Sequence, residues 1–173
     1  MNPKFTLIGL GNILLRDEGV GVKAVEALGK GFDFPEDVRL VDGGTLGLDL
    51  LPFIEGMDGI LFVDAVDFQK EPGTIVIVED EDLPSFLAPK LSLHHVGLSD
   101  LLFASSLMGI RPPKITLIGI QPENVEVGLD LSPRVTESFE KFLNTVLEKL
   151  REWGVMFRKK PNGESFHVSS HSV

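Results

Sequence analysis

Residues 59–66, GILFVDAV, constrain the fold most, because they form an apolar run broken only by Asp64. A strand that is covered on both faces has this composition, and such strands belong to parallel sheets with helices on either side. A second apolar run, residues 5–10, ends at glycine and predicts another buried strand. The chain is therefore expected to be an α/β protein.

Apolar residues recur at the spacing of one helix face between these runs, for example at Val20, Ala24, Ala27 and Leu28. Ser132 and Pro133 suit the N-cap and first turn of the last helix, and Gly154 suits its end. The expected strands are residues 5–10, 38–41, 59–66, 74–78 and 114–120, and the expected helices are residues 17–29, 46–54, 83–87, 98–108 and 133–153.

The link before residues 74–78 is too short to hold a crossover helix and contains Pro72 and Gly73. The fourth strand should therefore run antiparallel to the third. The order of elements predicts a three-layer α/β/α sandwich around a five-stranded, mostly parallel mixed sheet with strand four antiparallel. Residues 1–157 would form one domain, and residues 158–173 a polar tail without helical periodicity.

The composition excludes several kinds of site. The chain has no cysteine, so a metal must be held by histidine, carboxylate, backbone or water. A net charge of −10 disfavours nucleic acid as a partner. The first apolar run is short and broken by Gly9 and Gly11, so we expect neither a signal peptide nor a membrane span, and a cytoplasmic location.

Polar residues follow the strands at the edge where α/β proteins place their sites. Glu18, Asp42 and Asp64 follow the first three strands, and His94 lies in the loop before the fifth. Two carboxylates and an imidazole suit nickel, zinc or iron. The alternative roles are structural: Asp64 would cap a loop and Glu18 would complement a helix dipole, with Asp17 as the N-cap beside it.

Other candidates are weaker. His95 adjoins His94 but points elsewhere in extended chain, and His167 and His171 lie in the expected tail. The loop at residues 42–45 lets backbone approach a ligand, or is an ordinary turn with Thr45 as N-cap.

Five motifs in series resemble the hydrogenase maturation endopeptidases over about residues 5–153. They are LIGLGNILLRDEGVG at 7–21, DGGTLG at 42–47, FVDA at 62–65 with PGT at 72–74, SLHHVGLSD at 92–100, and GIQPE at 119–123 followed by LSP at 131–133. The resemblance implies that Glu18, Asp64 and His94 contact a metal and that Asp42 takes part in catalysis.

The resemblance also implies a reaction. A metal-dependent peptidase of aspartic or metallo type would remove the C-terminal extension of a nickel–iron hydrogenase large-subunit precursor. Nickel would come with the substrate, other divalent ions could replace it in vitro, and the enzyme would be a monomer.

Three other functions remain open. A non-catalytic nickel-binding assembly module would use the same residues. A peptidyl-tRNA hydrolase opens with a similar turn, but Ile13 stands in place of its proline and the charge disfavours RNA. A dinucleotide-binding oxidoreductase would need a third glycine where Leu14 stands.

Overall fold

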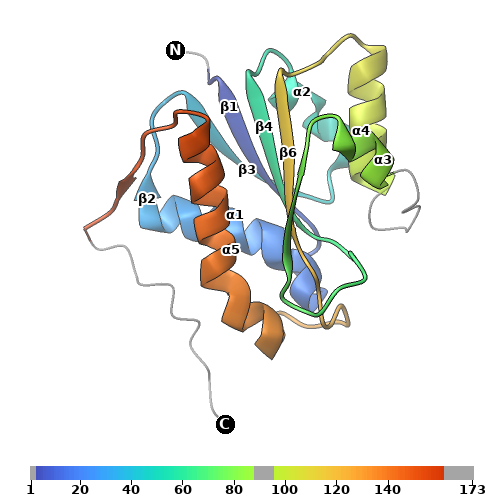
Figure 1. Cartoon of the computed structure of the whole chain (residues 1–173), viewed down its shortest axis with the longest axis vertical. Helices are drawn as coiled ribbons and strands as arrows, with labels where there is room; N and C mark the ends of the chain where they lie inside the picture. Colours follow the sequence, from blue (N-terminus) through green and yellow to red (C-terminus); the bar gives the residue numbers. More distant parts are fainter. Residues whose placement is uncertain (1–2, 88–95, 162–173) are drawn as a thin grey trace.

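The structure is a computed structural model that describes residues 3–87 and 96–161. Its centre is a five-stranded sheet in the order β3-β1-β4-β6-β5 (Figure 1). Neighbouring strands are parallel except β5, which is antiparallel to β6. The strands are β1 (Phe5–Leu10), β3 (Val38–Gly44), β4 (Gly59–Ala65), β5 (Ile75–Glu79) and β6 (Lys114–Ile120). The predicted fold class is confirmed.

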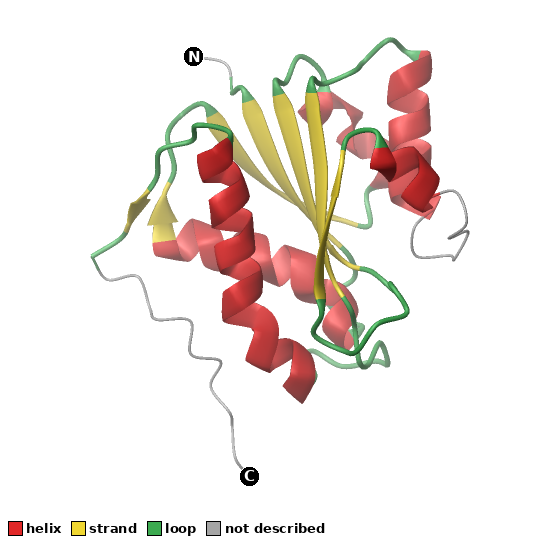
Figure 2. Ribbon diagram, viewed as in Figure 1, coloured by secondary structure: helices red, strands yellow, loops and turns green. Residues whose placement is uncertain are grey.

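Helices cover both faces of this sheet (Figure 2). One face carries α1 (Val20–Gly31) and α5 (Pro133–Glu152). The other carries η2 (Gly47–Leu50), α2 (Leu51–Ile54), α3 (Asp82–Leu87) and α4 (Val96–Leu107). Every residue of β4 is buried because the strand lies at the centre of the sheet with a hydrophobic cluster on each side.

The fourth strand of the main sheet has the predicted direction but an unexpected neighbour. β5 pairs with β6, with Ile75 opposite Ile120 and Glu79 opposite Thr116, so β6 lies between β4 and β5. A short link requires a reversal of direction, but it leaves room for a later strand to insert.

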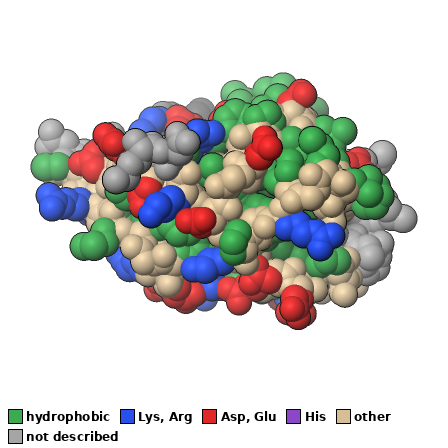
Figure 3. Space-filling view, turned by 90° about the horizontal axis from the view of Figure 1, so that it is seen from above, with side chains coloured by type: hydrophobic (Ala, Val, Ile, Leu, Met, Phe, Trp, Pro, Cys, Tyr) green, Lys and Arg blue, Asp and Glu red, His purple; other side chains and the backbone are tan. Residues whose placement is uncertain are grey.

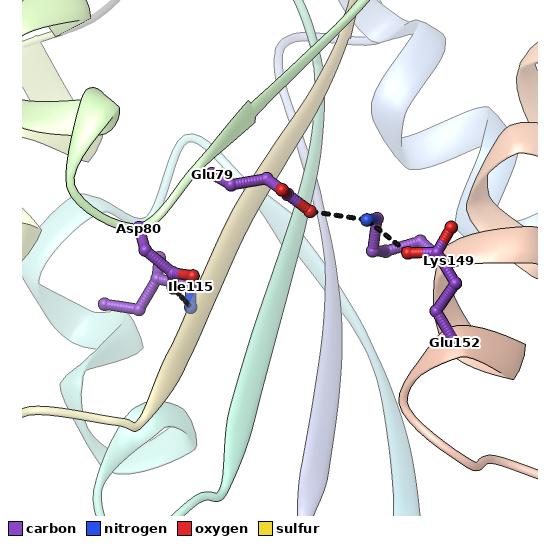
Figure 4. A network of polar contacts seen from close by, with 5 residues as sticks. All are labelled: Glu79, Asp80, Ile115, Lys149 and Glu152. Carbon is purple, nitrogen blue, oxygen red and sulfur yellow. Dashed lines mark hydrogen bonds and ion pairs between the residues drawn. The ribbon is translucent and has the colours of Figure 1, made fainter.

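Polar contacts at one end of β5 attach this edge strand to its neighbours (Figure 4). Lys149 of α5 is buried and lies between two carboxylates. It forms one ion pair with Glu79 and a second with Glu152, whose Oε2 lies 2.5 Å from Nζ of Lys149. Asp80 accepts a hydrogen bond of 2.7 Å from the backbone N–H of Ile115. The pKa of Lys149 is raised, because the two carboxylates outweigh the desolvation that would lower it. These contacts hold the free edge of the sheet against α5.

Two short strands that the sequence did not predict join the ends of distant segments. β2 (Phe32–Asp33) pairs antiparallel with β7 (Arg158–Lys159). The rings of Phe32 and Phe34 each lie 5.5 Å from that of Phe157. The start of the expected polar tail is therefore fixed by strand pairing, with aromatic packing just before it, whereas residues 162–173 lie outside the described residues.

The surface at the amino ends of the parallel strands mixes charged and apolar side chains (Figure 3). Hydrophobic side chains gather over the region of α4, where Phe103, Leu107 and Met108 are exposed. Within residues 3–87 and 96–161, no helix combines the length and the hydropathy that a membrane span requires.

Candidate functional site

A cleft of about 360 Å³ opens at the carboxyl ends of the parallel strands. Its walls come from segments far apart in sequence: the turn after β1, the 3-10 helix η1 (Arg16–Gly19), the end of β3 and the first turns of α4. Glu18 and Asp64 both line it. The structure therefore brings together two of the predicted site residues, at the edge where α/β sheets place their ligands.

Asp64 is the buried acid of this cleft. It is the penultimate residue of β4 and is only 5% exposed. Burial raises the pKa of its carboxyl well above the ordinary value of 3.8, and the nearby negative charge of Glu18 raises it further. A hydrogen bond from the backbone N–H of Ala65 opposes the shift. A carboxylate that is costly to ionise beside another carboxylate is well placed to receive a cation.

Glycines bring Glu18 close to Asp64. Gly11 has φ +115°, and a Cβ built on it would lie 1.8 Å from the carbonyl oxygen of Glu18 and 3.5 Å from Oδ1 of Asp64. A Cβ on Gly21 would lie 2.1 Å from the carbonyl oxygen of Val63. Only glycine fits at these two positions, so α1 begins in direct backbone contact with the sheet and η1 passes over the end of β4.

Asp17 is not an N-cap, and this prediction was wrong. Gly19 precedes α1, and the Asp17 carboxylate is fully buried. Its Oδ1 accepts a hydrogen bond of 2.7 Å from the N–H of Ser132, and its Oδ2 accepts bonds of 2.7–2.9 Å from the Ser132 hydroxyl and from the N–H groups of Glu123 and Asn124. Asp17 therefore fastens the loop between β6 and α5 to the turn after β1, while Glu18 next to it lines the cleft.

Asp42 lies outside this cleft. It is exposed and lines an adjoining shallow hollow with Ile13 and Val22. Because successive side chains of a strand face opposite sides, Val41 packs into the α4-side cluster and Asp42 faces the α1 side. Gly11, Asn12, Gly44 and Thr45 line both hollows and so form the boundary between them.

Two residues in the turns around the hollows, Thr45 and Asn12, have roles that differ from what the sequence suggested. Thr45 is not the N-cap of the following helix, because Leu46 precedes η2 and gives it no side-chain cap. Asn12 lines both hollows but was not among the predicted site residues. Its Oδ1 accepts a 2.9 Å hydrogen bond from the N–H of Leu14, which shapes the turn after β1. An asparagine that follows a strand and two alternating glycines was the available signal.

The four histidines, His94, His95, His167 and His171, lie outside the described residues. Gly97 and Leu98, which follow the histidine segment, line the cleft. Among the described residues, 3–87 and 96–161, no group of three or more histidines and acids has the arrangement of a metal site. The described part of the site is thus a pair of acids in a cleft. The first turns of α4 form part of the wall of this cleft.

Comparisons with known proteins agree with this architecture. The family model for hydrogenase maturation proteases, HycI, matches residues 22–149. The hydrogenase expression/formation protein HupD of Rhizobium leguminosarum bv. viciae is 41% identical over 163 residues, covering 93% of this chain and 81% of that protein. The hydrogenase 2 maturation protease of Escherichia coli (strain K12) is 41% identical over 153 residues, covering 88% of this chain and 93% of that protein.

Solved structures show the same relationship. The hydrogenase maturating endopeptidase HybD from E. coli superposes with a TM-score of 0.86 at 39% identity, covering 92% of this chain and 98% of that one. The [NiFe] hydrogenase maturation protease HybD from Thermococcus kodakarensis does so with a TM-score of 0.69 at 26% identity, covering 87% and 99%. The fold and the relatives define a peptidase, a hydrolase. The chain belongs to the hydrogenase maturation protease family, and the resemblance of its motifs is confirmed.

Proposed function

We propose that this protein is an endopeptidase that removes the C-terminal extension of a nickel–iron hydrogenase large-subunit precursor, and that it recognises nickel already bound to that precursor. The observation that carries the proposal is the meeting of Glu18 and Asp64 in one cleft at the carboxyl edge of the sheet. Relatives of this chain include the hydrogenase 2 maturation protease of E. coli, which supports a hydrogenase subunit as the substrate.

The electrostatics of the cleft favour a cation that arrives with the substrate. Asp64 is buried and its ionised form is disfavoured by desolvation and by Glu18. A divalent ion would reverse both effects, since it stabilises the two ionised carboxylates together. Two carboxylates from the described residues leave coordination positions open, as a transient ion requires.

His94 would supply the third contact. His94 precedes Gly97, which lines the cleft, by three positions in the sequence. An imidazole added to two carboxylates completes a ligand set suited to nickel. Substitution of other divalent ions for nickel in vitro follows from the same chemistry.

The cut itself would take place beside the nickel, which holds the scissile bond in place and supplies proximity. Asp42 is our candidate for the group that orients the attacking water as a general base. It lies in the hollow that adjoins the cleft across Gly11 and Asn12. The peptide of the precursor would therefore cross the boundary between the two hollows. Its nickel would lie in the cleft with Glu18 and Asp64, and its scissile bond would lie near the hollow that Asp42 lines.

The proposal is tested by incubating the protein with nickel-loaded and nickel-free precursor and weighing the products by mass spectrometry. We expect the loaded precursor alone to lose its extension. Glu18→Gln, Asp64→Asn and His94→Ala should each slow cleavage about 100-fold or more, because the anchor is displaced. Asp49→Asn, at an exposed acid outside the cleft, should cleave as the unaltered protein does.

Two outcomes would contradict the proposal. Binding of the loaded precursor without any change in its mass would indicate an assembly module instead of a peptidase. One tightly held zinc per purified chain would indicate a resident metal instead of a metal brought by the substrate.

A further inference from the structure

Exposed apolar side chains lie on loops at the same edge of the sheet as the cleft. Among residues 3–87 and 96–161, twelve large hydrophobic side chains are exposed, and seven of these lie on three loops at the carboxyl edge of the sheet. These loops are the turn after β1, the turn after β3 and the loop between β6 and α5, and the first two of them line the cleft. We define the apolar collar as these seven residues: Ile13, Leu14, Leu46, Leu48, Val125, Val127 and Leu129.

The outer part of the collar is held rigidly. Leu14 and Gly128 lie side by side, because the carbonyl oxygen of Leu14 accepts a 2.9 Å hydrogen bond from the N–H of Gly128. The N–H of Arg16 donates a bond of 2.9 Å to the carbonyl oxygen of Gly128. Lys23 of α1 donates to the carbonyl oxygen of Leu129. Val127 and Leu129 thus stand next to Leu14 on fixed backbone, with 82%, 62% and 57% of their surfaces exposed.

The buried carboxylate of Asp17 fastens the same loop. It accepts four hydrogen bonds, two from Ser132 and one each from the N–H groups of Glu123 and Asn124. Burying a charge costs free energy unless it is fully hydrogen-bonded. Here the result is a loop that presents apolar side chains to solvent in one arrangement. Ordering a surface before it binds reduces the entropy lost on association, as a docking surface requires.

We infer that the apolar collar docks the body of the nickel-loaded precursor protein around its metal. The inference rests on the proposed function, because the occupant is the substrate whose nickel enters the cleft. The turns after β1 and β3 line the cleft and also carry Ile13, Leu14, Leu46 and Leu48, so a protein whose metal reaches Glu18 and Asp64 comes close to these side chains. Apolar patches rimmed by polar residues mark protein contacts. The acids would then select the metal, and the collar would select the protein that carries it.

The test compares the kinetics of processing for variants at one exposed position. Val127→Asp and Val127→Lys should each raise KM for the nickel-loaded precursor about tenfold, since loss of an apolar contact of about 1.4 kcal/mol corresponds to that factor. The value of kcat should change little, because the acids of the cleft are untouched. Met156→Asp is the matched control, because the side chain of Met156 is 86% exposed. Met156 follows α5, which starts near the collar and whose 20 residues carry the chain about 30 Å away from it.

The outcomes separate the inference from the proposed function. If the unaltered protein leaves the loaded precursor uncut, the proposed function fails. If it cuts and both Val127 variants keep the same KM, the collar does not dock the precursor. A rise in KM for only one of the two charges would show that repulsion, and not the lost apolar contact, is responsible, and would overturn the inference. Thermal melting of each variant should match the unaltered protein, since Val127 packs against no core residue.

Discussion

Replacing Asp64 by asparagine should make the metal-free protein more stable while abolishing processing. The carboxyl is 5% exposed, and its pKa is raised by burial and by Glu18. Each pKa unit by which folding raises a carboxyl corresponds to about 1.4 kcal/mol of lost stability above both pKa values. Asparagine keeps the shape and an acceptor for the N–H of Ala65 but carries no charge. We expect a gain of about 1–2 kcal/mol at pH 7, as removal of site strain commonly yields.

The gain should depend on pH in a direction set by the raised pKa. Well below 3.8 the carboxyl is protonated in both the folded and the unfolded chain, so ionisation carries no penalty. As the pH rises above that value, the unfolded chain ionises first, and the folded state is progressively disfavoured until the pH passes the raised pKa. Asp64→Asn removes this penalty. Its advantage should therefore be small near pH 4 and largest at neutral pH.

Differential scanning calorimetry of the metal-free protein would measure the effect. A stabilisation of 1–2 kcal/mol corresponds to a Tm increase of about 2–8 °C for a chain of this size. Asp49→Asn, at an exposed position, should shift stability by less than about 0.5 kcal/mol. An unchanged or lower Tm for Asp64→Asn at pH 7, or an equal gain at pH 4 and pH 7, would refute the argument that Asp64 is held at an energetic cost.

Three further substitutions test the framework around the site. Gly11→Ala should destabilise the fold by about 3 kcal/mol or more, because the new Cβ would lie 1.8 Å from a backbone oxygen at φ +115°; denaturant unfolding measures this, and a loss below 1 kcal/mol would contradict it. Asp17→Ala should cost about 3–5 kcal/mol, since it leaves four buried donors without their acceptor, and hydrogen exchange at Asn124 should accelerate; unaltered exchange there would count against the fastening role. Lys149→Met should cost less than about 1 kcal/mol in urea titrations, because Glu79 and Glu152 are 51% and 62% exposed and the apolar stem is kept; a larger loss would mean that this network is worth more than its exposure suggests.

Much of the fold could be predicted because its signals are local. The apolar run ending at Asp64 dictates a buried central strand, and the length of the link before β5 dictates its reversal. The neighbour of β5 could not be predicted in this way, since pairing is decided by which later strand inserts beside β4. The pair β2–β7 was missed because each strand has two residues, too few for any periodicity.

The residues of the site likewise fall into those that local sequence patterns could place and those that they could not. The positions of Glu18 and Asp64 follow from the rule that polar residues after parallel strands meet at one edge. The role of Asp17 could not be read from its position, because its four donors come from residues 123–132, more than 100 positions away. Asp42 follows the same rule as Asp64 but faces the other side, since a strand alternates its side chains and β3 turns Val41 towards the cluster that packs on α4.

We propose that two acids of this chain, Glu18 and Asp64, bind a metal that belongs to another protein. X-ray absorption at the nickel edge tests it most directly, on loaded precursor alone and after addition of the unaltered protein or the double variant Glu18→Gln/Asp64→Asn. We predict that oxygen ligands join the nickel only when the unaltered protein is added. A nickel spectrum that stays the same on addition of the unaltered protein, while the extension is still removed, would contradict recognition through the metal.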